Sequence, residues 1–419
     1  MMIRLFLASS CLTSFAAAAE IKTEVLKPEP IRISIDELPE PNLSESANQH
    51  PQVIPVPEDA VLKAPAGFTV NLVAEIPQAR WLAVTPAGEL LCVSSRTNTI
   101  FRLPDTNGDG VADEKAVFAD EQDGLNMPFG MAFLKDGFYV GNTNGVVRFE
   151  YEKGQKELEG PPKTITDLPG QGYNEHWTRN VIPAPDGGLF VSVGSKSNAD
   201  IEEPPRASVL SVSADGSRKD VYAFGLRNPV GLAIHPQTKQ LYATVNERDK
   251  IGDGLVPDYF TSVKQGAFYG WPYAYLKPSL LDPRHVENGK SVRPELAEKT
   301  TTPDVLFEAH SAALGLAFYT ADENAASAFP ERYRQGAFVA FRGSWNRSEG
   351  TGYKIVFVPF NDEGRPEGGY EDFVTGFLTD PAGPTTFGRP VGTTILPDGS
   401  LAFTEEGNGR VYRVSYQGE

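Results

Sequence analysis

The sequence predicts an all-β protein, and two observations support this fold class. From residue 63 to residue 417 the apolar residues occur in short runs of strand length, and no 12-residue segment has good helical periodicity. A unit of strand, turn and second strand recurs six times, and its turn centres lie about 50 residues apart. A β-unit with this period is typical of a β-propeller, so we expect six blades and an extended N-terminal segment.

The six units begin with similar apolar segments. They read WLAVTPAGELLCVSS from Trp81, FGMAFLKDGFYVGNT from Phe129, RNVIPAPDGGLFVSVGS from Arg179, VGLAIHPQTKQLYATVN from Val230, LGLAFYTADEN from Leu314 and VGTTILPDGSLAFTEE from Val391. The Asp and Gly residues of the turns supply the positive φ that tight hairpins need. Most units continue into a third strand, such as TIFRLPD or RVYRVSY. The fifth unit is expected to carry extra residues between its first two strands.

Two segments precede the repeats. Residues 1–19 place one basic residue before a short apolar run and a row of alanines, which predicts a secretory signal peptide and a periplasmic or secreted protein. No later segment approaches 18 uninterrupted apolar residues, so no membrane span is expected. Residues 20–62 are rich in Pro, Glu and Ser, and we interpret them as a linker or tail partly extended along the surface.

Composition excludes several classes of function. The formal net charge of −17 makes nucleic acid a poor partner. Removing the signal peptide leaves Cys92 as the one cysteine, which excludes an internal disulfide, a CxxCH haem site and a cysteine-built metal site. Cys92 lies in an apparent buried strand, where a small core residue is expected.

Charged residues precede the first strands of several units. In a propeller these strands line the central channel, and the loops that lead into them form one rim. His176 precedes the third unit, Arg227 the fourth, His310 the fifth and Arg389 the sixth. A rim that gathers histidine and arginine predicts a site for an anionic ligand combined with proton chemistry.

A second candidate site follows from spacing within residues 105–114, DTNGDGVADE. Oxygen-bearing side chains occupy loop positions 1, 3, 5 and 9, and Gly110 allows a sharp turn. Position 12 is Ala116, so the bidentate acid of an EF-hand is missing. We predict a structural calcium loop, with a solvated turn as the alternative; its ligands would be Asp105, Asn107, Asp109 and Asp113.

Several longer motifs, in order along the chain, carry a family resemblance. They are HWTRN at 176–180, SVGSxSN at 192–198, GLRNPVGLA at 225–233, VNERD and GDGLVPDYFTSV within 245–263, YGWPYAY at 269–275 and GSWNR at 343–347. With them the chain resembles the soluble glucose/sorbosone dehydrogenases that depend on pyrroloquinoline quinone (PQQ), most closely the L-sorbosone dehydrogenase-like branch. The resemblance runs from about residue 65 to the C-terminus and implies a six-bladed propeller with the quinone on the channel rim.

The resemblance also implies roles for single residues. His176 matches the general base that takes the substrate's hydroxyl proton, a task suited to a group with a pKa near 6.5. Arg227 matches the arginine that polarises the reactive quinone carbonyl. The implied cofactor contacts are Arg227, Asn228, Arg342 and Arg389, with Asn126 as a further candidate.

A channel calcium ion is implied as well, bound by the backbone carbonyls of Glu247 and Arg248. The glucose-type enzymes have a Gly-Pro pair at these two positions, and Glu247 could add a carboxylate ligand. Ser195 stands where those enzymes have an aspartate that orients the base, and Glu175 is a candidate to replace that carboxylate.

We therefore expect a quinoprotein that oxidises an aldose or a sugar-derived, sorbosone-like aldehyde with PQQ and calcium, and that passes electrons to an external acceptor. Two other classes stay open. One is a calcium-dependent lactonase or related hydrolase that uses Asn246, Glu247 and Asp249. The other is a propeller without cofactor that only binds sugars or partner proteins.

Overall fold

The structure, a computed structural model, describes residues 21–135, 137–170 and 176–418. The expected signal peptide, residues 1–19, lies outside the described residues, and so does Glu175. Strands dominate the described part of the chain, whose one α-helix is the single turn α1 (Pro294–Ala297). The predicted all-β class is confirmed.

Six sheets of four or five strands follow one another along the described residues. The first three contain β6 (Ala79–Val84), β7 (Leu90–Ser94), β8 (Thr99–Leu103) and β9 (Ala116–Ala119); β10 (Met131–Leu134), β11 (Gly137–Asn142), β12 (Gly145–Glu150) and β13 (Lys163–Asp167); and β14 (Val181–Pro183), β15 (Leu189–Val193), β16 (Ser208–Val212) and β17 (Lys219–Phe224). The fourth contains β18 (Asn228–Ile234), β19 (Leu241–Asn246), β20 (Pro257–Ser262) and β23 (Val305–Ala309). The fifth contains β24 (Ala313–Phe318), β25 (Gly336–Phe341), β26 (Lys354–Pro359), β27 (Tyr370–Val374) and the short β2 (Pro30–Ile31).

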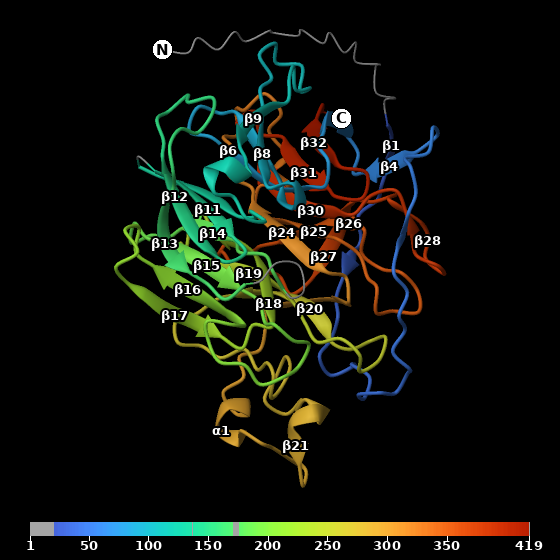
Figure 1. Ribbon diagram of the computed structural model, residues 1–419. Coiled ribbons are helices and arrows are strands. Elements are labelled where there is room, and N and C mark those ends of the chain that lie inside the picture. Colours follow the sequence, from blue (N-terminus) through green and yellow to red (C-terminus); the bar gives the residue numbers. More distant parts are fainter. Residues whose placement is uncertain (1–20, 136, 171–175, 419) are drawn as a thin grey trace.

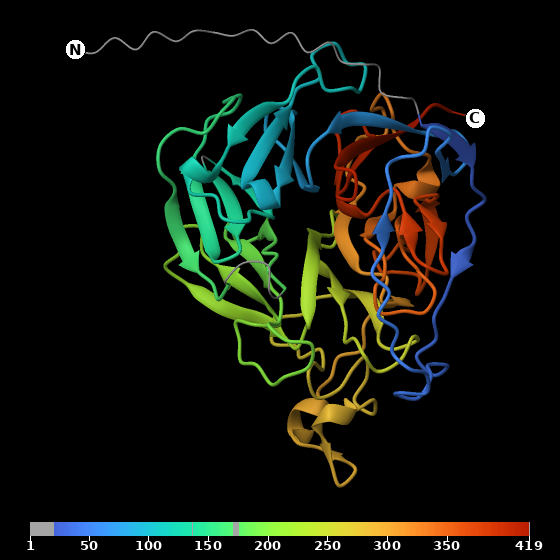
Figure 2. The same ribbon diagram turned by 45° about the vertical axis from the view of Figure 1, so that its right-hand side comes forward.

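The sixth sheet closes the ring of sheets seen in Figure 2. It joins three C-terminal strands to one N-terminal strand, in the order β30 (Pro390–Ile395), β31 (Leu401–Glu405), β32 (Arg410–Tyr416) and β5 (Phe68–Glu75). The first strands β6, β10, β14, β18, β24 and β30 contact one another in a closed cycle around the axis. Strand β5 pairs with β32 along its whole length, so the two ends of the repeat region hold each other.

Small residues let the first strands approach one another. A Cβ on Gly231 of β18 would lie 2.3 Å from the carbonyl oxygen of Leu314, and one on Gly315 of β24 would lie 2.3 Å from that of Val391. The hydroxyl of Thr244 donates to the Leu314 carbonyl oxygen at 2.6 Å, which joins the fourth sheet to the fifth. The axis is therefore tightly packed, and the loops before the first strands end close together.

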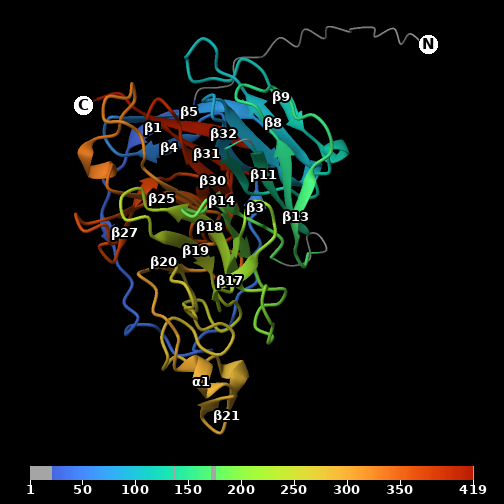
Figure 3. The same cartoon turned by 90° about the vertical axis from the view of Figure 1, so that its left-hand side faces the viewer.

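Segments outside the repeats lie on the ring. In the N-terminal segment β1 (Lys22–Val25) pairs with β4 (Val61–Ala64), and β2 pairs with β27. A three-stranded sheet joins β28 (Leu378–Asp380), β29 (Thr385–Thr386) and β3 (Gln52–Val53). An insertion after β20 carries α1, β21 (Val286–Glu287) and β22 (Lys290–Ser291), and it projects from one end of the molecule (Figures 1 and 3). The described helices include none that is long and apolar enough to cross a membrane.

Candidate functional site

A cavity of about 190 Å³ is lined by residues from the loops before the first strands, from these strands, and from the connections between the second and third strands of the fourth and fifth sheets. The third to fifth sheets supply most of the wall, and Arg80 of β6 completes it. The lining residues that the argument uses are Arg80, His176, Arg227, Asn228, Glu247, Asp249, Asp258, His310, Arg342 and Trp345. The structure thus brings together three of the residues expected on the rim, His176, Arg227 and His310, and three that the family resemblance implied for cofactor or calcium, Asn228, Glu247 and Arg342.

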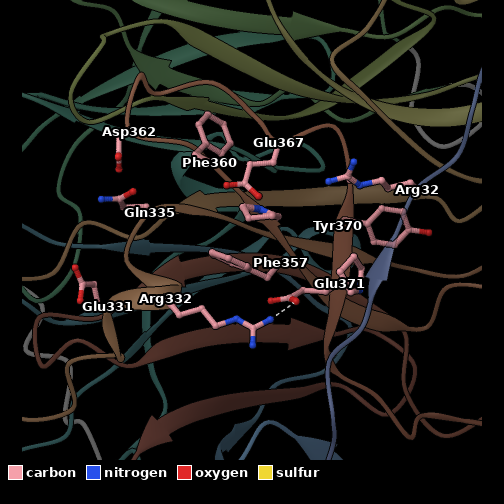
Figure 4. A pocket seen from close by; sticks show the side chains of 13 residues that line it. Arg32, Glu331, Arg332, Gln335, Phe357, Phe360, Asp362, Glu367, Tyr370 and Glu371 are labelled. Carbon is pink, nitrogen blue, oxygen red and sulfur yellow. Dashed lines mark hydrogen bonds and ion pairs between the residues drawn. The ribbon is translucent and has the colours of Figure 1, made fainter.

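A second, larger cavity of about 510 Å³ lies elsewhere, on the outer strands β26 and β27 of the fifth sheet. Figure 4 shows its polar walls and the ion pair between Arg332 and Glu371. None of the residues predicted for catalysis, cofactor or metal lines it. We therefore take the cavity at the rim as the candidate site.

The ring of His176 is fixed in one tautomer by its neighbours. Its Nδ1 lies 3.0 Å from the carbonyl oxygen of Ser195 and 2.9 Å from the Ser195 hydroxyl. That hydroxyl gives its own hydrogen to the carbonyl oxygen of Ser197 at 2.6 Å, so it can only accept from the ring. Because Nδ1 faces two acceptors, it carries the hydrogen, and Nε2 keeps a free lone pair.

Burial and charge keep this imidazole neutral. Burial and then the positive charge of Arg227 lower the pKa of His176 to about 3, and the negative charge of Asp249 offsets this only in part. His176 is therefore neutral at neutral pH, with a lone pair on Nε2. A serine, rather than a carboxylate, orients it.

Arg227, Asp249 and His310 form what we call the histidine–carboxylate network. One Asp249 oxygen accepts from Arg227 at 2.8 Å, and the other faces Nδ1 of His310 at 3.3 Å. Asn198 joins the two sides: its amide oxygen accepts from Arg227 at 3.0 Å and from the Asp249 backbone at 2.9 Å. All three network members are held by more than one bond.

The surroundings of His310 favour its protonated form. Its Nδ1 faces the Asp249 carboxylate, and its Nε2 faces the carbonyl oxygen of Gly252 at 3.1 Å, so both ring nitrogens meet acceptors. Burial alone would lower the pKa of His310, but the hydrogen bond and the charge of Asp249 outweigh burial and raise it above the ordinary value. In the network, Arg227 and His310 therefore face the two oxygens of one carboxylate.

Two further acids are buried beside the network. Burial raises the pKa of Glu247 to about 8 and that of Asp258 to about 6. Asp258 accepts from the backbone of Glu247 at 2.8 Å and of Ala312 at 2.7 Å, so both its oxygens are bonded. Glu247 Oε1 and Asn228 Oδ1, by contrast, are buried and have no hydrogen-bond partner among the described residues. Two unpartnered acceptors on a cavity wall suit a cation or a donor group of a ligand.

Arg80, Arg342, Arg389 and Glu406 form what we call the arginine cluster. Glu406 makes short ion pairs with Arg80 and Arg342, and Arg389 lies 3.8 Å from it. Burial would raise the pKa of Glu406, but the three guanidinium groups hold it well below its usual range. Three guanidinium groups therefore gather around one carboxylate at this side of the cavity, and those of Arg80 and Arg342 line its wall.

The remaining predicted residues are placed as follows. Arg389 is not among the cavity-lining residues and lies behind Arg342, to whose carbonyl oxygen it donates at 3.4 Å. The side chain of Arg248 turns to Asp282. Asn126 is exposed and does not line the cavity, so the structure does not bring it to the site.

The predicted calcium loop is one exposed turn that gathers its four side chains. The carboxylate of Asp105 accepts from the backbone of Gly108 and of Gly110, each at 2.8 Å, and Asp113 accepts from Thr106. Gly110 has a φ of 86°, as the sharp turn requires. Among the described residues no group of three His, Cys, Asp or Glu side chains is arranged to hold a metal ion, so calcium binding here stays a prediction.

Sequence reasoning missed several residues of the site. Arg80 directly precedes the first unit's WLAV segment, and Glu406 ends the sixth unit's FTEE segment. These positions in the repeat could have indicated that both residues lie near the rim. Asp258 and Asn198 lay inside quoted motifs without an assigned role. No signal in the sequence joins Arg80 to Glu406, because 326 residues separate them.

The chain matches the TrAA12-like family over residues 62–257 and 259–417. Among curated proteins it is 27% identical to an uncharacterized protein of Borreliella burgdorferi, over 85% of this chain and 92% of that protein. It is 24% identical to quinoprotein glucose dehydrogenase B of Acinetobacter calcoaceticus, over 46% of this chain and 47% of that enzyme.

Two solved structures share the fold. A calcium structure of a Trichoderma reesei enzyme of carbohydrate-active enzymes family AA12 superposes with a TM-score of 0.72 at 18% identity, covering 90% of this chain and 99% of that one. The holo form of the pyranose dehydrogenase PQQ domain from Coprinopsis cinerea gives a TM-score of 0.70 at 18% identity, covering 87% and 100%.

Proposed function

The chain belongs to the TrAA12-like family, and from that premise we propose that it is a PQQ-dependent oxidoreductase that oxidises an aldose or a sugar-derived, sorbosone-like aldehyde. The names of a quinoprotein glucose dehydrogenase and of a pyranose dehydrogenase PQQ domain among its relatives support the class. The observation that carries the proposal is the Nε2 lone pair of His176, to which no described residue donates, at a cavity whose wall also holds the guanidinium groups of Arg80 and Arg342.

The residues present fit PQQ, a quinone with three carboxylates. Arg80 and Arg342 line the cavity, and with Arg389 behind them they would hold its carboxylates. Arg227 and Asn228 would lie at the quinone. Bound PQQ supplies a two-electron acceptor for the oxidation, and calcium beside it would polarise the quinone.

Calcium fits the acids beside the network. The carbonyl oxygens of Glu247 and Arg248 are the proposed ligands, and Glu247 Oε1 is an additional oxygen that lacks a partner among the described residues. The calcium structure of the Trichoderma reesei relative supports a role for this ion.

The protein's own part in the reaction is proton transfer and orientation. His176 accepts the substrate's hydroxyl proton at Nε2 while Ser195 holds its Nδ1 hydrogen. The positive charge that forms on His176 is attracted by Asp249, whose charge already acts on the ring. Arg227 keeps its guanidinium at the cavity because Asn198 and Asp249 accept from it.

Location and organisation are part of the proposal. Residues 1–19 would direct export to the periplasm or outside the cell, residues 20–62 would be a separate N-terminal segment, and residues 63–417 the catalytic propeller. An external acceptor would reoxidise the cofactor.

The hydrolase alternative is less well supported. It needs the Asp249 carboxylate as a metal ligand, yet both oxygens of that group are bonded to Arg227 and His310. A propeller that only binds sugars has no use for the orientation of His176 by Ser195.

The test adds PQQ and calcium to purified apoprotein and follows dye reduction with a panel of aldoses and aldehydes. Arg227→Ala should weaken both quinone binding and turnover. Hydrolysis of lactones without PQQ would favour the hydrolase, and wild-type protein that binds no PQQ would refute the dehydrogenase proposal.

A further inference from the structure

Residues 33–50 of the N-terminal segment, here called the strap, lie against the loop of residues 249–253, which forms part of the candidate site. In Figures 1 and 2 the blue N-terminal segment runs down one side of the ring towards the yellow part of the chain. Ile33, Ile35 and Leu38 pack on an apolar cluster that includes Ile251 of the loop. Apolar burial therefore fixes the strap beside the site.

The strap also bonds the backbone of this loop. The backbone N–H of Asn42 donates to the carbonyl oxygen of Ile251 at 2.7 Å. The hydroxyl of Ser46 accepts from the backbone of Gly252 at 3.1 Å, and that of Ser44 from Asp253 at 2.9 Å. Loop residues 251–253 lie outside the strands, so these bonds fix backbone that no sheet holds.

The same loop carries both acceptors of the His310 ring. Asp249 lies at its start, and the Gly252 carbonyl oxygen binds Nε2 of His310. Asp249 in turn binds Arg227. A shift of the loop would therefore move the histidine–carboxylate network.

A third set of contacts reaches the cavity wall. Trp345 lines the cavity, and its carbonyl oxygen accepts from the backbone of Gln49 at 2.8 Å. The ring of His50 stacks on the Trp345 indole, with centroids 5.5 Å apart and planes 9° apart. The amide of Asn346 donates to the carbonyl oxygen of Ala47.

We propose that the strap is a positioning element of the site, which holds the loop of residues 249–253 and Trp345 in the arrangement that ligand binding needs. The inference rests on the proposed function only for the choice of PQQ as the binding probe. It assigns a task in the site to a segment that lies before the residues matched by the family.

The test is the double variant Ser44→Ala/Ser46→Ala, compared with Thr23→Ala. Thr23 lies before the strap in the same N-terminal segment, and its hydroxyl accepts from the backbone of Val70 at 3.0 Å rather than from the loop of residues 249–253. Both variants remove hydroxyl acceptors of backbone N–H groups. The double variant removes them where the strap meets the loop of residues 249–253, whereas Thr23→Ala does so away from that loop.

The readouts are the His310 imidazole resonances in histidine-labelled apoprotein, assigned with His310→Gln, and PQQ affinity with calcium. The double variant should shift the His310 resonances and weaken PQQ binding about tenfold, as expected from two lost hydrogen bonds. Thr23→Ala should change neither, and Ser44→Thr/Ser46→Thr should restore both. The proposal is overturned if the double variant matches Thr23→Ala in both readouts.

Gly254→Ala tests the packing of the strap beside this loop without removing a hydrogen bond. A Cβ there would lie 2.9 Å from Cγ of Pro39, so the strap and the backbone at residue 254 must shift relative to each other. It should shift the His310 resonances as well, and unchanged resonances would contradict the proposal. If wild-type protein binds no PQQ but the His310 resonances respond as expected, the proposed function fails and the role of the strap stands.

Discussion

The two charged groups beside the cavity differ in how their charges are balanced. In the arginine cluster, three guanidinium groups share the carboxylate of Glu406. In the histidine–carboxylate network, Asp249 lies between Arg227 and His310, and each of these two residues also donates to a backbone carbonyl oxygen. The arginine cluster presents the guanidinium groups of Arg80 and Arg342 to the cavity, where they can bind an anionic ligand, whereas the network fixes the positions of its members.

This difference suggests a division of work. Guanidinium groups on the cavity wall attract an anionic ligand, whereas charged groups that are bonded to one another mainly fix each other's orientation. His176 belongs to the orienting side, because Asp249 and Arg227 both act on its pKa. Substitutions in the arginine cluster should therefore change mainly PQQ affinity, whereas substitution of His176 should change mainly turnover.

The largest expected effect is that of His176→Gln. Loss of the proton acceptor should lower the turnover number about 10²–10⁴-fold. PQQ affinity should stay close to that of the wild type, because His176 is not in the arginine cluster. Turnover and PQQ titration on the same preparations check this. Turnover within about threefold of wild type would show that His176 is not the base.

Glu406→Gln should have opposite effects on stability and binding. It leaves three buried or half-buried guanidinium groups without their shared carboxylate, which should cost about 3–5 kcal/mol of unfolding free energy in the apoprotein. Loss of the negative charge of Glu406 beside the cavity should also make PQQ raise the Tm more than it does in the wild type. Thermal unfolding with and without PQQ measures both, and an unchanged apoprotein Tm would contradict the cluster's charge balance.

Arg342→Gln should weaken PQQ binding about tenfold to a hundredfold, because one charge-assisted hydrogen-bond partner is lost. Turnover at saturating PQQ should fall much less. Arg218→Gln is a matched control, since Arg218 is exposed and pairs only with surface acids. If Arg342→Gln has normal PQQ affinity but low turnover, Arg342 acts in catalysis rather than in cofactor binding.

The pH dependence of apoprotein stability should report on His176. Its folded pKa of about 3 lies below the ordinary value of 6.5, so between these values the unfolded chain binds the proton and the folded chain does not. Stability from this group is therefore lost as the pH falls from 6.5 towards 3. As the pH falls through this window, the unfolding free energy of His176→Gln should rise relative to that of the wild type by roughly 1 kcal/mol per pH unit. Denaturant unfolding at several pH values measures this difference. If the unfolding free energies of the two proteins vary in parallel with pH, the pKa of His176 is not depressed in the folded state.

The smallest effect is expected outside both groups, in the loop of residues 105–113. If calcium binds there, a chelator should lower the Tm, and Asp105→Ala/Asp109→Ala should reduce that response without abolishing activity. Thermal unfolding with and without chelator, together with an activity assay, tests this. An unchanged response to chelator in the double variant would count against the loop as a calcium site.

The sequence by itself determined the fold class and much of the rim. Strand-length apolar runs and Pro-Asp-Gly turns are local features, because the pleat and the turn conformations depend on neighbouring residues. Their period set the order of the units, and the position before each first strand placed His176, Arg227 and His310 on one side of the ring. The same reasoning put Arg389 on the rim, yet the structure buries it behind Arg342.

Only the tertiary structure decided which groups meet. The pairing of β5 with β32, the ion pair of Arg80 with Glu406 and the bonds of the strap to the loop of residues 249–253 all join distant parts of the chain. The tautomer of His176 likewise depends on Ser195 and Ser197, which the fold brings to its ring. Such contacts depend on how the sheets close around the axis, and local periodicity carries no information about which distant side chains that closure brings together.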